Sequence, residues 1–316
     1  MFVLAWVGRQ KTQALVVVVL VALALPPLGA ILRPYVTEAV IGMLCIAFVR
    51  IDVGEFRSFT RHPGLVLAAC IWTTVVVPIS VFIVFWLLEL SVVSPALFHI
   101  LILQAVAAPM MSAPALAALM GLDGTLVLVV LLLGTAVAPF FAPLLVHLAG
   151  LDIGISPFSH SVWLALAVVG SAAVGLVIRK LAGRQTIARY SDELDGLNIV
   201  MLFIYACALL RDVGLGFFSE PFMMIGLTAL AFAVYFSYIA VGFLVFAPAG
   251  AKTALAIGML TAERNLALMV VSTGGIMPPI AWHYFAVNTF PILLTPRLVR
   301  PIARFIDARE KQKAAR

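Results

Sequence analysis

Four polar residues at the centre of an otherwise apolar stretch are the part of this sequence best equipped for chemistry. Thr261, Glu263, Arg264 and Asn265 lie inside residues 251–275, AKTALAIGMLTAERNLALMVVSTGG. About 20 apolar residues are enough to cross a bilayer as a helix, and a charge at the bilayer centre costs at least about 2.5–3.5 kcal/mol. Charged side chains at that depth therefore face protein or water, and they usually mark a functional site.

Glu263 and Arg264 are neighbours in the sequence, so on a helix they point about 100° apart and do not face each other. Each then needs a partner of its own, either another side chain or a ligand. A guanidinium can grip a carboxylate through two parallel hydrogen bonds, which makes Arg264 a candidate for binding an anion. The alternative is a buried ion pair that only holds two helices together.

The composition indicates an all-α polytopic membrane protein. Hydrophobic residues make up 64% of the chain, charged residues 11%, and the mean hydropathy is +1.17. A soluble domain contains about 25% charged residues, so the lipid bilayer is the expected surrounding. The net charge of +6 comes from short loops, where basic residues report topology, so no nucleic-acid partner is predicted.

Ten apolar runs, separated by prolines, glycines and charged residues, predict ten transmembrane helices. A topology with both termini in the cytoplasm places every basic residue except Arg33, Arg211 and Arg264 on the cytoplasmic side, as the positive-inside rule requires. We therefore expect an integral protein of a bacterial inner membrane with cytoplasmic N- and C-termini. The helices are expected near residues 13–32, 35–49, 65–88, 96–120, 125–148, 161–178, 197–211, 222–246, 251–273 and 279–300.

The two halves of the chain echo each other. The proline pair of the fifth helix, Pro139 and Pro143, recurs in the tenth as Pro291 and Pro296. Five helices per half is an odd number, so the second half would lie upside down relative to the first. Inverted repeats of this kind are typical of secondary transporters. The expected repeats are residues 1–150 and 151–316, the second with a basic cytoplasmic tail.

The fourth helix of each half is predicted to be broken. Pro109 and Pro114 interrupt the first one within APMMSAP, and the polar cluster around Glu263 falls at the matching place in the second. Paired broken helices lie at the midplane site of many transporters. Non-helical backbone is tolerated at membrane depth only where it faces protein or a cavity. We expect the two breaks to line the substrate site.

The candidate substrate-binding residues share a polar side chain and a predicted place near these breaks. They are Arg264, Asn265, Glu263, Thr261, Ser112, Gln104, Asn288, Thr289 and Thr73. For Thr73, Asn288 and Thr289 the alternative is hydrogen bonding to carbonyls of their own helix or contact with a neighbouring helix. Glu263 and Asn265 are also candidates for binding a coupling ion, Na⁺ or H⁺.

Enzyme chemistry is not predicted. The sequence contains no H-E-x-x-H, no G-x-S-x-G and no phosphate-cradling G-x-x-x-x-G-K-[ST]. Its three cysteines lie in apolar runs and form no disulfide framework or metal-binding spacing. No cofactor or metal site is expected beyond the coupling ion, and transport would be driven by a gradient or by a partner.

Two segments carry a resemblance to a known family. TAERNLALMV, residues 261–270, resembles the ninth-helix motif of the bile acid:sodium symporter family, and APMMSAPALAALMGLDGTLVLVVLLLGTAVAPFFAPLL resembles its fourth and fifth helices. The family belongs to a wider group that includes arsenite exporters. The resemblance implies a panel-and-core transporter in which helices four and nine cross at the substrate and ion site.

The sequence departs from the family at the sodium ligands. The acid that sodium-coupled relatives carry in the ninth helix is Leu260 here, and the Gln before the Asn is Arg264. The fourth-helix Ser-Asn pair falls on Ala113 and Pro114, or on Pro114 and Ala115. Arg264 at this place could act as a fixed positive charge. We therefore expect weak or absent sodium dependence.

Three functions remain open from the sequence. The first is a secondary transporter of a small organic anion. The second is a non-transporting membrane sensor or scaffold with the same fold, although no soluble signalling domain is recognisable. The third is an arsenite or oxyanion exporter, which a cysteine in the fourth-helix break would support; the break contains none.

Overall fold

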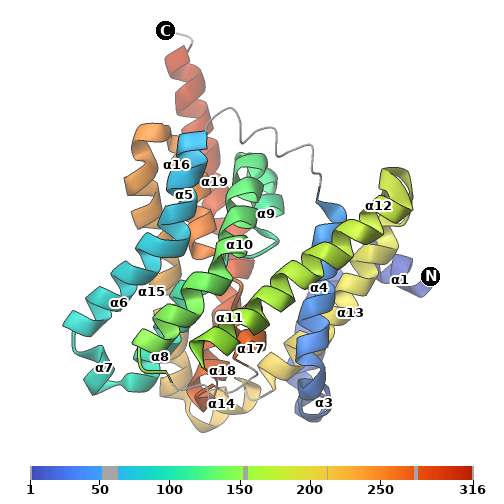
Figure 1. The fold of residues 1–316 in the computed structure, drawn as a ribbon. Coiled ribbons are helices and arrows are strands. Elements are labelled where there is room, and N and C mark those ends of the chain that lie inside the picture. Colours follow the sequence, from blue (N-terminus) through green and yellow to red (C-terminus); the bar gives the residue numbers. More distant parts are fainter. Residues whose placement is uncertain (1, 52–62, 152–155, 212, 274–276, 315–316) are drawn as a thin grey trace. The chain divides into compact units, whose positions relative to one another are not determined.

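The structure is a computed structural model that describes residues 2–51, 63–151, 156–211, 213–273 and 277–314 (Figure 1). Every element named in these ranges is a helix. Within the described ranges, six helices are long and apolar enough to cross a membrane, namely Pro26–Arg50, Pro63–Leu87, Gly124–Leu148, Pro157–Arg189, Ser191–Leu210 and Pro221–Ala249. The chain is thus an all-helical protein with the composition of a membrane-embedded one, while the ten-span count and the inverted repeats stay predictions.

The two predicted breaks are present in the structure. The helix predicted near residues 96–120 is divided into α8 (Pro95–Val106) and α9 (Ala113–Leu119), and the one predicted near residues 251–273 into α16 (Ala251–Ala262) and α17 (Leu266–Ser272). Pro109 explains the first break, because a residue that precedes proline avoids helical dihedral angles. The two short apolar helices, α8 and α16, end at these breaks and fall below the length of a full span.

The chain folds into two compact units made of alternating segments. Unit 1 contains residues 1–51, 153–226 and 267–286, and unit 2 contains residues 52–152, 227–266 and 287–316. Neither unit coincides with one of the predicted repeats, since each takes helices from both halves of the sequence.

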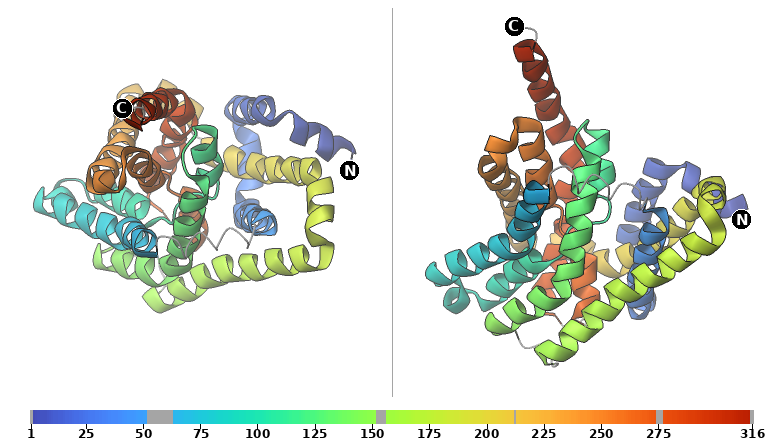
Figure 2. Two further views of the ribbon diagram at one scale, coloured as in Figure 1. Left: turned by 90° about the horizontal axis from the view of Figure 1, so that it is seen from above. Right: turned by 45° about the horizontal axis from the view of Figure 1, so that its top comes forward.

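Unit 1 is built around α13 (Ser191–Leu210), which packs against most of the N-terminal helices. The helix α1 (Phe2–Arg9) lies along α13 (Figure 2), and α4 (Val36–Arg50) packs against both α13 and α12 (Ser171–Arg189). Gly8 and Gly196 allow the closest approach, because a Cβ on either would overlap the backbone of the facing helix. The other elements assigned to unit 1 are α2 (Lys11–Ala24), α3 (Pro26–Leu32), η1 (Arg33–Tyr35), α11 (Pro157–Ala165), η4 (Leu166–Gly170), α14 (Val213–Ser219) and most of α17 and α18 (Pro279–Val287).

Unit 2 surrounds both breaks with long apolar helices. The helix α10 (Gly124–Leu148) packs against α8, α9, α5 (Pro63–Ile71) and α16. Its core is aliphatic, with Val127, Val130, Leu131, Ile257 and Leu260 fully buried. The remaining elements are η3 (Trp72–Val76), α6 (Val77–Leu87), α7 (Leu90–Val93), most of α15 (Pro221–Phe246), η5 (Ala247–Ala249) and α19 (Thr289–Ala314).

Three helices extend beyond their predicted ends. The helix α12 continues to Arg189 with a kink at Gly183, where φ is 78°. The helix α13 begins at Ser191 rather than near residue 197, since its first acids pair with arginines of unit 1. The helix α19 runs on to Ala314, and its Asp307 forms an ion pair with Lys252 of α16. Charged residues extend these three helices beyond their apolar segments, and a hydropathy profile does not detect such extensions. Residues 52–62, part of a loop predicted to be cytoplasmic, lie outside the described ranges.

Candidate functional site

The two breaks cross inside unit 2. The backbone N–H of Met110 donates to the carbonyl of Glu263 at 2.8 Å, and that of Asn265 donates to the carbonyl of Ala108 at 2.7 Å. Pro109 and Arg264 thereby form an isolated antiparallel bridge. The two non-helical segments thus form backbone hydrogen bonds with each other, which supplies partners that buried backbone groups need.

The guanidinium of Arg264 binds three backbone carbonyls next to this bridge. Its Nε donates to Thr261 O at 2.7 Å, and its Nη1 donates to Thr73 O at 2.9 Å and to Ala107 O at 3.1 Å. The side chain is only 1% exposed. A buried charge is expensive unless it is paired and hydrogen bonded, and here carbonyl dipoles from three segments supply the negative ends.

Each of the three carbonyls has lost the amide that an uninterrupted α-helix would offer it. The helix α8 ends before Pro109, which leaves Ala107 O outside the helix. The N–H of Asn265, four residues after Thr261, bonds across the crossing instead. The π-helical turn η3 shifts the pairing so that Val77 N–H reaches Trp72 O. The next donor in that register would be Pro78, which has no N–H, and so Thr73 O is free for Arg264.

One nitrogen of Arg264 remains open. Within the described residues, the buried Nη2 has no hydrogen-bond partner. The Cζ atom lies 5.6 Å from the centroid of the Tyr238 ring, within the range of a cation–π contact. The guanidinium is therefore held in place by carbonyls and an aromatic ring, with one edge that still offers donors.

Glu263 does not pair with Arg264. Its Oε1 lies at hydrogen-bond distance, 2.6 Å, from the hydroxyl of Tyr235 on α15, and the same hydroxyl lies 2.5 Å from Oγ1 of Thr295 on α19. The carboxyl group is completely buried, and in the described part of the chain its Oε2 has no hydrogen-bond partner. The two adjacent charged residues lie in the break between α16 and α17, outside helical conformation, and their side chains have different partners.

A second polar contact joins α8 to Asn288, the residue just before α19. Gln104 Nε2 donates to Asn288 Oδ1 at 3.2 Å, and both side chains are fully buried. Among the described residues, Asn288 Nδ2 has no hydrogen-bond partner. This pair adds another unsatisfied donor to unit 2.

The other predicted residues contribute in different ways. Thr261 Oγ1 donates to Ile257 O and accepts a hydrogen bond from Trp72 Nε1 at 3.2 Å. The Thr73 hydroxyl donates to carbonyls of its own helix, so Thr73 reaches Arg264 through its backbone. Asn265 joins the crossing through its N–H. Ser112 precedes α9 without capping it through its side chain, and Thr289 begins α19, half-buried.

Sequence reasoning missed three hydroxyl-bearing residues of this cluster, Tyr235, Tyr238 and Thr295. Each lies in the middle of a helix, and all three are at most 9% exposed. The two tyrosines are the visible signal, because a tyrosine at mid-span needs a partner for its hydroxyl. The two tyrosines lie near the break because α15 packs closely against α16. A Cβ on Gly242 of α15 would meet Cα of Gly258 and Oγ1 of Thr261 on α16.

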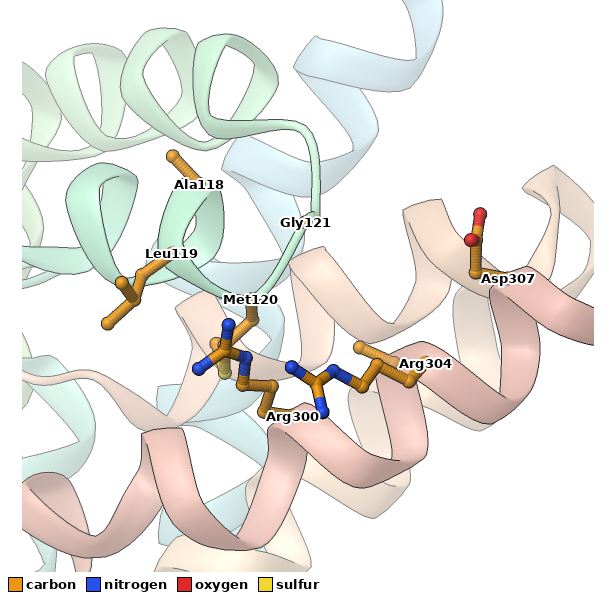
Figure 3. A pocket seen from close by; sticks show the side chains of 8 residues that line it. Ala118, Leu119, Met120, Gly121, Arg300, Arg304 and Asp307 are labelled. Atoms are coloured by element: carbon orange, nitrogen blue, oxygen red, sulfur yellow. The ribbon is translucent and has the colours of Figure 1, made fainter.

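No cluster of three or more His, Cys, Asp or Glu side chains suited to a metal ion occurs in the described ranges. A surface pocket of about 290 Å³ lies away from the crossing, between the α9–α10 turn and α19. Arg300 and Arg304 point together toward Met120 in this pocket, whereas Asp307 points away (Figure 3). This surface belongs to the basic tail and carries none of the predicted site residues.

Comparison with protein-family models finds no match to this chain, and comparison with curated proteins finds none either.

Proposed function

We propose that this protein is a secondary transporter of a small organic anion, similar to bile acid:sodium symporters, and that the anion binds at Arg264. The observation that carries the proposal is the crossing of two broken helices around a buried guanidinium with one open nitrogen. Pairs of broken helices supply the midplane binding sites of transporters, and the ionisable residues they carry are functional by default.

Charge favours an anion as the substrate. Carbonyl dipoles solvate the guanidinium of Arg264 but leave its net charge of one, and the carboxyl group of Glu263 is engaged by Tyr235. A carboxylate that reached Nη2 would supply both the opposite charge and the missing acceptor. A lysine offers a point charge without this planar fork.

The same geometry argues against sodium coupling. Sodium would need hard oxygen ligands, and the carbonyls freed at the crossing already accept hydrogen bonds from Arg264. Leu260 and Ala113, at positions of sodium ligands in the resembling family, have aliphatic side chains and are fully buried. In this proposal Arg264 is a built-in cation that takes the place of a bound one.

The finer topology is part of the proposal. It comprises ten spans in two inverted repeats, both termini in the cytoplasm and residence in a bacterial inner membrane. The support is the asymmetric distribution of basic residues. Reporter fusions at both termini and in the 179–196 segment should all read cytoplasmic, and a periplasmic signal from that segment would contradict the ten-span model.

The experiment is uptake by purified protein in proteoliposomes. Labelled acetate, benzoate and cholate, three monocarboxylates of increasing apolar size, are offered with and without sodium and proton gradients. We expect uptake of at least one of them without a sodium requirement. The alternatives predict other results: an oxyanion exporter would move arsenite instead, and a sensor or scaffold would move none of these solutes.

Arg264→Lys tests the role of the arginine. The positive charge stays but the fork is lost, so substrate affinity should fall about tenfold or more, which corresponds to about 1.4 kcal/mol, while the protein still inserts and folds. The matched control is Arg33→Lys in unit 1, where the arginine stacks 4.1 Å from the Trp282 ring centroid; uptake should be unchanged. Equal affinity in Arg264→Lys and the parent protein would refute an anion clamp at Arg264.

A further inference from the structure

Four oxygen atoms next to the crossing form a continuous chain of hydrogen-bond contacts. Glu263 Oε1 lies 2.6 Å from the Tyr235 hydroxyl, which lies 2.5 Å from Thr295 Oγ1, which in turn lies 2.9 Å from Pro291 O. All three distances are those of O–H···O hydrogen bonds. The chain joins the broken helix α16 to α15 and α19, and its three side chains are completely buried.

The number of hydrogen atoms that this chain needs points to a protonated Glu263. Three contacts need three hydrogens, and Tyr235 and Thr295 supply one each. The carbonyl of Pro291 can only accept, so the third hydrogen must lie on the carboxyl group. With Glu263 protonated, every contact is satisfied in one direction: Glu263 donates to Tyr235, Tyr235 to Thr295, and Thr295 to Pro291 O.

The ionised form cannot keep this geometry. A carboxylate on Glu263 requires Tyr235 to donate to it, and then Thr295 must donate back to Tyr235. The contact between Thr295 Oγ1 and Pro291 O would be left without a hydrogen, so two oxygens would face each other with their lone pairs. The Thr295 side chain would have to rotate. Loss of the proton therefore reverses the chain and moves a side chain of α19.

Among the described residues, no positively charged side chain forms an ion pair with Glu263. Oε2 of Glu263 has no hydrogen-bond partner within the described ranges, and an unpaired buried carboxylate is costly. The neighbouring Arg264 directs its guanidinium to carbonyls. The ionisable side chains along the middle of the surrounding helices are Tyr235 and Tyr238 on α15, Cys70 on α5, Arg264 itself and the exposed Arg297 on α19.

We propose that Glu263 is a proton-binding site and that the proton is the ion coupled to anion binding at Arg264. The coupling half of this inference rests on the proposed function. With Glu263 protonated, the crossing carries one positive charge, which a single carboxylate neutralises. With Glu263 ionised, the crossing is already neutral, and an anion would add a net negative charge to a buried site.

The direction of coupling follows from this charge count. A proton on Glu263 strengthens anion binding, and by linkage an anion at Arg264 strengthens proton binding to the same extent. Proton and monovalent anion would move together without net charge. Anion affinity should therefore be highest at low pH and fall by up to about tenfold per pH unit once Glu263 ionises, since one proton is linked to binding.

Infrared difference spectroscopy tests the proton site without a substrate. Purified protein is titrated with acid and base while the carbonyl stretch of protonated carboxyl groups is recorded. We expect a band that titrates in the parent protein and is missing in Glu263→Gln. Tyr235→Phe keeps the carboxyl group but removes its hydrogen-bond partner, so the band should persist at a shifted frequency.

The matched control is Thr135→Val on α10, set against Thr295→Val. Thr135 is buried in the same unit, and in the described residues its hydroxyl has no hydrogen-bond partner. The substitution at Thr135 should leave the band unchanged, whereas that at Thr295 should shift it. A carboxyl group that stays ionised at every pH at which the parent protein is folded would overturn the proposal. An unshifted band in Tyr235→Phe would also overturn it, and this variant serves if Glu263→Gln fails to fold.

Proteoliposomes loaded with a pH-sensitive dye test the coupling with the acetate, benzoate and cholate panel. Proton entry should accompany anion entry in the parent protein, and Glu263→Gln should bind anions equally well at all pH values without moving protons. Anion uptake with no proton movement would overturn the coupling while leaving the transporter proposal intact. A titrating Glu263 in a protein that moves none of the anions would sustain the proton site and refute the proposed function.

Discussion

The arginines at the start of α13 in unit 1 and Arg264 in unit 2 are satisfied in different ways. At the start of α13 in unit 1, Arg9 pairs with Asp192 at 2.8 Å and Arg50 with Asp195 at 2.5 Å, all in contact with solvent. In unit 2, Arg264 is buried and binds three backbone carbonyls. These exposed arginines are paired with carboxylates, whereas the buried guanidinium of Arg264 binds backbone carbonyls that do not accept a hydrogen bond within their own helices.

The two arrangements differ in the structure that each requires and in whether the positive charge is neutralised. Surface ion pairs contribute about 0–1 kcal/mol and can form wherever two helices end together. A carbonyl cage around a guanidinium requires two interrupted helices, a π-helical turn and a proline that cannot donate. Such a cage holds a fixed charge without neutralising it. Arg264 therefore keeps its charge and a nitrogen without a partner among the described residues, whereas Arg9 and Arg50 are paired with carboxylates.

The largest effect is expected from Arg264→Ala. It leaves three buried carbonyls without donors and opens a cavity, so the free energy of unfolding should fall by about 3–5 kcal/mol, as for a broken buried pair. Anion binding should be lost. Chemical denaturation in detergent and binding on the same preparation measure both. Arg264→Met is the control, because it fills the space but cannot donate; full recovery of stability by Met would contradict a role for the carbonyl hydrogen bonds.

Removing the second polar pair should have a smaller effect. Asn288→Ala removes the buried hydrogen bond between Gln104 Nε2 and Asn288 Oδ1, which should lower the free energy of unfolding by about 1–3 kcal/mol. Denaturant midpoints of purified variants check this. The double variant with Gln104→Ala should cost less than the sum of the single changes, since both ends of the bond are then gone. Additive losses would show that the two side chains act independently.

The turn that frees Thr73 O can be altered through Pro78. Pro78→Ala restores an N–H that competes with Arg264 for carbonyls of η3, so anion affinity should fall by the equivalent of about 1 kcal/mol, the net value of one hydrogen bond. Binding measurements on the purified variant provide the check. Pro143→Ala, a proline inside α10 at a distance in sequence from the cage, is the control. A stronger loss at Pro143 than at Pro78 would argue against the freed carbonyl.

The smallest effect is expected in unit 1. Arg9→Ala removes an exposed ion pair with Asp192 and should change the free energy of unfolding by less than about 1 kcal/mol, with no change in anion uptake. The residual contribution should shrink in high salt, because salt screens exposed charges. Thermal unfolding at low and high salt provides the measurement. A loss as large as that of Arg264→Ala would erase the contrast between the two units.

Local rules account for the parts of the structure that the sequence predicts well. Apolar length places the long helices, and prolines place the break between α8 and α9, because a missing N–H acts on its own neighbours. The second break contains no proline, and it was predicted from the polar cluster around Glu263 and its matching place in the second half of the sequence. The ends of α12, α13 and α19 differ from the predicted ones, because a hydropathy profile does not include ion pairs or the kink at Gly183.

By itself, the sequence determined that the chain is a helical, membrane-type protein with two interrupted helices and a charged pair at one of them. Only the tertiary structure decided the partners of that pair. Tyr235 contacts Glu263, and Thr295 contacts Tyr235, from helices that are distant in the sequence. Arg264 donates to the carbonyl of Thr73 rather than to a carboxylate. The physical reason is that apolar length and proline chemistry act within one turn of helix, whereas a hydrogen-bond partner depends on where separate helices cross.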